Sequence, residues 1–204
     1  MRVLRPVVAA GIFVLLAGPV LAQERYATID VRAGYTVAPK GNDDDLTIGQ
    51  SLKGQSSFGG GAFIALGDRL HLGLTVDWAH HSVYQPPDRT IIGGANDPEW
   101  NLVHSFLKVS FDIVQVKSWT VALNAGPGIM VFSPNQVIKD ATGKRSDLHF
   151  AVNGGATITW WFADRIGIVA SPQADLAFKK TSGQIFQNKK AVFFPITGGF
   201  QFKI

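Results

Sequence analysis

The chain has 204 residues and no cysteine, and its 19 Lys and Arg against 15 Asp and Glu give a formal net charge of +4. So mild a charge, with no basic cluster, argues against nucleic-acid binding, and the lack of cysteine excludes a disulfide scaffold. The length suits one domain, and the 22 glycines favour strands and turns over helices.

The chain begins with a segment that is expected to be a secretory signal peptide. Two arginines are followed by an apolar stretch from Val7 to Leu21, and Ala22 ends a small-residue pattern of the kind that signal peptidase cleaves. A membrane anchor is the alternative, but the stretch is short and is broken by glycine and proline. The expected organisation is therefore a signal peptide over 1–22 and one β-barrel domain over 23–204.

Alternation with a period of two residues recurs along the rest of the chain. Apolar or aromatic side chains occupy every second position in Ala27–Val37, Leu70–Trp78 and Leu107–Ile113. Successive side chains of a strand point to opposite faces, so this period predicts strands. Eight are predicted, at 25–38, 55–66, 69–81, 102–115, 118–132, 148–162, 165–179 and 191–204.

The connections between these segments alternate in length. Long ones are predicted at 39–54, 82–101, 133–147 and 180–190. Short ones are predicted at Gly67-Asp68, Val116-Lys117 and Ala163-Asp164. Outer-membrane barrels combine long outside loops with tight periplasmic turns. The predicted fold class is all-β, an eight-stranded antiparallel up-and-down transmembrane β-barrel in a Gram-negative-type bacterial outer membrane.

Charged residues share one face of the predicted strands, the less apolar one. They are Asp30, Arg32, Asp77, Lys108, Asp112, Asp175 and Lys203. A soluble barrel would turn the apolar set inward, whereas the signal peptide, the long strands and the loop asymmetry favour lipid outside and a polar lumen. We expect the seven to form a lumen charge network that closes the bore, with Arg32 and Lys108 bridged to carboxylates.

Aromatic residues gather near both ends of the predicted strands, as in the two aromatic girdles of membrane barrels. The periplasmic set is Tyr26, Trp119, Trp160, Trp161, Phe162, Phe200 and Phe202. The opposite set is Tyr35, Trp78, Phe132, Phe150, Phe178 and Phe194. The alternative explanation is that aromatic residues merely favour strands.

The last eight residues, Thr197 to Ile204, place a glycine before alternating apolar residues that reach the end of the chain. This stretch is similar to the terminal signal read by the barrel-assembly machinery, although Ile204 stands where Phe or Trp is usual. The chain resembles the OmpA- and OmpX-like barrels and related porin-family proteins over residues 23–204. The resemblance implies outer-membrane lipid, lipopolysaccharide and the assembly machinery as partners, and a monomer.

The histidines are the first candidates for chemistry. By parity His81, His104 and His149 face the lumen near the extracellular mouth, and His71 faces it near the periplasmic end. Their spacing has no metal signature, so we interpret them as hydrogen-bonded residues of a polar mouth. No metal and no cofactor are expected.

His80 and Ser82 form a His-x-Ser pair at the top of the third predicted strand. Some outer-membrane lipid A deacylases resemble this chain in size and use a His and a Ser two residues apart on a barrel strand. Both side chains would face lipid, but no acidic partner is found on that surface. The favoured function is a structural or surface-interaction role without catalysis, and the alternatives are a lipid A-modifying hydrolase or a narrow pore.

Prolines interrupt the last two predicted strands. Pro172 and Pro195 lie at a similar distance from the loop between them, and neither can donate a ladder hydrogen bond. They predict a locally weak seam, a feature through which some lipid-modifying barrels admit acyl chains. The simpler interpretation is that each proline occupies a site whose nitrogen needs no partner.

Overall fold

The computed structural model describes residues 26–37, 51–52, 54–84, 99–143, 146–178 and 191–204. The predicted signal peptide and most of the predicted loops at 39–54, 82–101 and 180–190 lie outside these residues. No helix in the described part of the chain is long and apolar enough to cross a membrane.

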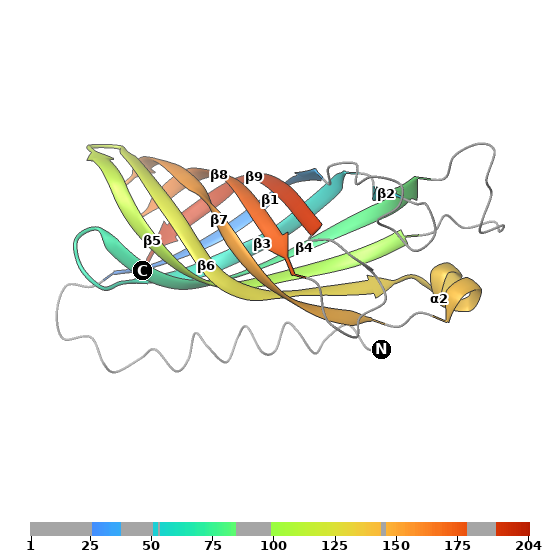
Figure 1. Cartoon of the computed structure of the whole chain (residues 1–204). Coiled ribbons are helices and arrows are strands. Elements are labelled where there is room, and N and C mark those ends of the chain that lie inside the picture. The colour runs from blue at the N-terminus through green and yellow to red at the C-terminus, as the bar shows by residue number, and fades with distance from the viewer. Residues whose placement is uncertain (1–25, 38–50, 53, 85–98, 144–145, 179–190) are drawn as a thin grey trace.

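Eight long strands form one closed ring (Figure 1), which confirms the predicted fold class. Each strand pairs antiparallel with its neighbours along the chain, and β1 pairs with β9 to close the barrel. The strands are β1 (Ala27–Val37), β3 (Gln55–Ala65), β4 (Leu70–Tyr84), β5 (Glu99–Val116), β6 (Trp119–Pro134), β7 (Asp147–Ala163), β8 (Ile166–Ala177) and β9 (Ala191–Lys203).

Two short elements supplement the ring. Strand β2 (Ser51–Leu52) pairs with the far end of β4. Helix α2 (Gln136–Thr142) lies within the predicted loop 133–147; Asn135 caps it by accepting a hydrogen bond from the backbone N–H of Ile138 at 3.1 Å. Gly143 ends the helix in the left-handed conformation, with φ of 66°. The helix was not predicted from the sequence.

Alternation along each strand separates a lipid-facing surface from a lumen. Val31 and Leu107 are more than half exposed on the outer surface, whereas their neighbours Arg32 and Lys108 are buried inside. The apolar face therefore points outward and the charged face inward, as expected of a barrel in lipid.

All strand ends that lead into the predicted long connections lie at one end of the barrel. Cross-strand pairs such as Thr36 with Gln55 and Ser82 with Glu99 bring these ends together. We call this the loop end and the opposite one, with its tight connections, the turn end. In outer-membrane barrels the tight turns face the periplasm.

Strand pairing is interrupted on both sides of β8. Between β8 and β9 it stops after Pro172 with Ile196 and resumes at Asp175 with Phe193, without a change of register. Between β7 and β8 two further pairs are missing, one of them opposite Pro172. The seam predicted from the prolines is thus a gap in the ladder without a bulge.

Side chains on the lumen side replace part of the missing ladder. Gln173 Nε2 donates to the carbonyl oxygen of Ala156 at 3.0 Å, and Thr197 Oγ1 lies 3.4 Å from that of Ser171. These carbonyl groups lie beside the interrupted pairs, so the side-chain bonds lower the cost of leaving backbone acceptors unpaired in a membrane.

Candidate functional site

The lumen is the candidate functional site, and its loop half is filled by apolar side chains. Strands β5, β6 and β9 supply most of them, and α2 adds Ile138, which is fully buried. We call this cluster the apolar plug: Trp100, Leu102, Phe106, Met130, Phe132, Ile138 and Phe193. The expected polar lumen is therefore wrong for the loop half, because the lumen-facing positions there carry large apolar residues.

The three predicted mouth histidines, His81, His104 and His149, are buried against the aromatic rings of the plug. Ring centroids lie 5.6 Å apart for His81 and Phe193, and 5.1 Å apart for Phe132 and His149. These histidines do not line a wet mouth. Within the described ranges, no group of three His, Asp or Glu side chains could hold a metal ion.

Arg32 forms the centre of the charged layer beneath the plug. Its guanidinium lies 2.7 Å from Asp30 Oδ1 and 3.4 Å from Asp77 Oδ1, and it donates to Ser171 Oγ at 3.0 Å. Lys108 donates instead to Gln173 Oε1 at 3.2 Å. Among the described residues no carboxylate lies within 4.0 Å of the Lys108 ammonium, so of the two expected bridges only that of Arg32 forms.

The other predicted charges form separate pairs rather than one network. Asp175 contacts His104 and Asn153, deep in the barrel. Asp112 lies 3.1 Å from His71 Nε2, and Lys203 Nζ lies 3.9 Å from the centre of the Trp161 ring. The seven predicted residues all lie in the lumen; three of them form one ion-paired group around Arg32, and the other four contact histidine, amide or aromatic side chains.

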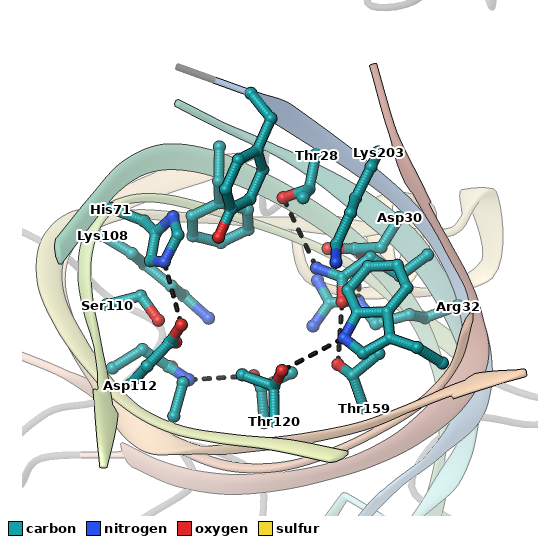
Figure 2. A pocket seen from close by; sticks show the side chains of 17 residues that line it. Thr28, Asp30, Arg32, His71, Lys108, Ser110, Asp112, Thr120, Thr159 and Lys203 are labelled. Atoms are coloured by element: carbon teal, nitrogen blue, oxygen red, sulfur yellow. Dashed lines mark hydrogen bonds and ion pairs between the residues drawn. The ribbon is translucent and has the colours of Figure 1, made fainter. Parts of the chain in front are cut away.

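A polar pocket of about 60 Å³ occupies the turn half of the lumen. Figure 2 shows its side chains arranged around a central hollow, with hydroxyl groups from Thr28, Ser110 and Thr159 among them.

Tyr26 and Trp161 also line the pocket, so the prediction that they belong to the periplasmic girdle is wrong. The predicted girdle residue Phe132 belongs to the plug, whereas Trp119, Trp160 and Phe162 are exposed on the outer surface.

The His-x-Ser pair lies on the outer surface at the loop end. His80 Nε2 is 3.0 Å from Glu99 Oε1, and its Nδ1 is 3.0 Å from Asn101 Oδ1. Ser82 Oγ accepts a hydrogen bond from Gln55 Nε2 at 2.9 Å. We call these five residues the outer polar cluster. The acidic partner missing from the sequence prediction is Glu99, which pairs with Ser82 across the extended β4–β5 hairpin.

Comparison with known proteins places the fold. No protein-family model matches the chain, and no curated protein matches it. Among solved structures, a major outer membrane protein from Thermus thermophilus is similar with a TM-score of 0.59 and 12% identity, covering 89% of this chain and 100% of that one. Neisserial surface protein A has a TM-score of 0.55 and 11% identity, and the match covers 89% of this chain and 98% of that one. Outer membrane protein OprG of Pseudomonas aeruginosa has a TM-score of 0.51 and 11% identity, and the match covers 88% of this chain and 95% of that one.

The chain has the fold of a small outer-membrane β-barrel. In such a barrel the exposed belt of apolar side chains contacts lipid, the loop end faces the cell exterior and the turn end faces the periplasm. The apolar plug then lies in the outer half of the lumen, and the pocket lies in the periplasmic half.

Proposed function

We propose that this outer-membrane barrel is a non-catalytic, non-conducting protein with a structural or surface-interaction role. The observation that carries the proposal is the apolar plug. Phe106, Phe132 and Phe193 are each at most 2% exposed inside the loop half, and Ile138 of α2 is buried with them. An eight-stranded barrel has room for little beyond its own side chains, so these rings leave no aqueous path to the outside.

The lipid-facing belt and the loop end provide the surfaces for this role. Outer-membrane lipid and lipopolysaccharide would contact the belt, and partners outside the cell would meet the predicted loops. The last strand carries alternating exposed apolar residues, among them Phe200 and Phe202. This pattern supports recognition of β9 by the barrel-assembly machinery.

The purified barrel, inserted into planar lipid bilayers, is expected to show no steady conductance. The physical reason is that ions would have to displace the packed rings of the plug and give up their hydration water among mostly apolar side chains. A general porin inserted in the same membranes serves as the positive control. A stable open state of the barrel, in preparations whose folding is verified by heat-modifiable gel mobility, would favour the narrow pore instead.

A lipid-modifying hydrolase is the second candidate, favoured by the contact between His80 and Glu99 next to Ser82. A hydrolytic triad needs a histidine nitrogen directed at the serine hydroxyl while the other is held by the carboxylate. Here Asn101 occupies the remaining nitrogen and Gln55 bonds the hydroxyl. A catalytic arrangement would require these two amides to release His80 and Ser82, so we rank this function second.

Mass spectra of lipid A decide between these functions. Cells that express the barrel are expected to contain the same acylated lipid A species as cells without it. Cells with Ser82→Ala provide the matched control, because that variant keeps the barrel and removes the only hydroxyl of the His-x-Ser pair. A lipid A species lacking an acyl chain that appears with the native barrel and disappears with Ser82→Ala would establish the hydrolase.

A further inference from the structure

The pocket in the turn half of the lumen is a blind, polar cavity. Tyr26, Trp161 and Lys203 line it near the strand ends, so it opens at the turn end. Toward the loop end Lys108 lines it, and Phe106 of the plug lies next along the same face of β5. A solute could therefore enter from the periplasm but could not pass through.

Positive charges exceed negative ones in the lining of this pocket. Asp30 is held by Arg32 at 2.7 Å, and Asp112 lies 3.1 Å from His71. Both carboxylates of the lining are thus committed to other partners. The lining also contains the ammonium groups of Lys108 and Lys203. In the part of the chain that the structure describes, neither ammonium has a carboxylate within 4.0 Å.

Lys108 is the more unusual of the two. It is only 2% exposed, and its ammonium donates to a single neutral acceptor, Gln173 Oε1. An ammonium carries three N–H donors, and the carboxylates of Asp30, Asp77 and Asp175 act on this one only through space, from beyond 4.0 Å. Figure 2 shows its nitrogen turned toward the centre of the pocket, with Lys203 Nζ facing the same hollow.

We propose that this pocket binds a small periplasmic oxyanion, with Lys108 contacting it at the inner end and Lys203 at the entrance. The hydroxyl groups of Thr28 and Ser110 line the walls and supply neutral donors, and the Asn124 amide has a second N–H besides the one it donates to Thr157 Oγ1 at 3.0 Å. The cavity of about 60 Å³ corresponds to about four to six water positions. The ligand is thus a phosphate or a carboxylate of about six heavy atoms.

Nuclear magnetic resonance of the uniformly ¹⁵N-labelled barrel in detergent micelles tests the proposal. Inorganic phosphate and lactate are titrated separately, each at constant ionic strength against chloride, so that the two sources of an oxyanion are distinguished. Saturable shifts of the amide signals of β5 around Lys108 are expected for at least one of the two anions. Lys108→Met is expected to weaken binding at least tenfold, the usual effect of removing a charged hydrogen-bond donor.

Two further variants make the result specific to the pocket. Lys203→Gln, at the entrance, is expected to weaken binding severalfold and decides the matter if Lys108→Met fails to fold. Lys117→Gln is the matched control, because Lys117 is exposed at the turn end but does not line the pocket. The proposal is overturned if neither anion produces saturable shifts, or if both pocket variants bind as tightly as the native barrel. Absence of conductance is measured separately and bears only on the proposed function.

Discussion

Replacement of Gly199 by alanine is expected to prevent the barrel from closing. Gly199 in β9 pairs with Arg32 in β1, at the seam that joins the first and last long strands. A Cβ atom there would lie 1.9 Å from the carbonyl oxygen of Val31 and 2.8 Å from the Cα of Arg32. Both are backbone atoms, so β1 and β9 would have to separate. We expect the free energy of unfolding to fall by about 3 kcal/mol or more, the upper end of the cost of overpacking.

The neighbouring glycine provides the control for this variant. A Cβ atom at Gly198 would meet only the carbonyl oxygen of Val169, at an ordinary 3.5 Å. Gly198→Ala is therefore expected to fold like the native chain. The measurement is the fraction of protein that runs as the folded, heat-modifiable band on a gel after refolding into micelles. Equal folded fractions for the two alanine variants would show that the close approach at Gly199 is not needed.

Arg32→Met is expected to destabilise the folded barrel by about 3–5 kcal/mol, the usual cost of breaking a buried ion pair. The substitution keeps much of the side-chain volume but leaves Asp30, which is 4% exposed, without its cation at 2.7 Å. Asp77 loses its contact at 3.4 Å in the same change. Such a loss is a large part of the total stability of an ordinary domain.

Urea titration of the barrel in lipid vesicles measures this effect as a shift of the unfolding midpoint. The double variant Asp30→Asn with Arg32→Met should recover part of the loss, because it no longer buries that carboxylate without a partner. Arg165→Met is the matched control. Arg165 is exposed in the turn before β8, so this variant should change the free energy of unfolding by no more than about 0.5 kcal/mol. If Arg32→Met and Arg165→Met unfold at the same urea concentration, the ion pairs of the lumen contribute nothing measurable.

The ring of strands could be predicted because lipid and lumen impose opposite demands on alternate residues. That contrast is strong along β1, over Leu70–Trp78 of β4 and over Leu107–Ile113 of β5, where apolar residues alternate with polar residues or glycine. It weakens in the loop half, where Leu102 and Phe106 stand on the same face as Lys108. Parity placed His104 and Lys108 of this face inside correctly, but it carried no information that the outer lumen is apolar.

Helix α2 and Glu99, the acidic member of the outer polar cluster, were missed for local reasons. The helix has seven residues, too few for a helical period to emerge, although Asn135 and Gly143 are a capping residue and a terminator that could have indicated it. Glu99 was missed because the β4–β5 hairpin continues beyond the predicted strand ends, up to Tyr84 and from Glu99, where the regular alternation of apolar and polar residues has already ended.

Contacts across the lumen could not be derived from sequence spacing. The expected bridge of Arg32 forms because Asp30 is its neighbour on the same face of one strand. Lys108 meets Gln173, 65 positions later, and that contact depends on strand tilt and on the stagger accumulated around the ring. Such quantities belong to the closed barrel as a whole.

The pairing of β1 with β9 has a consequence for how the chain acquires its shape. Thr28 lies opposite Lys203 in this seam, so nearly the whole described sequence separates the two partners. Contacts between such distant parts of a chain form slowly, because the loop-closing entropy must be overcome before they stabilise anything. Until β9 arrives, β1 keeps an open edge that could pair with another chain, and the unfinished barrel depends on protection from aggregation during that interval.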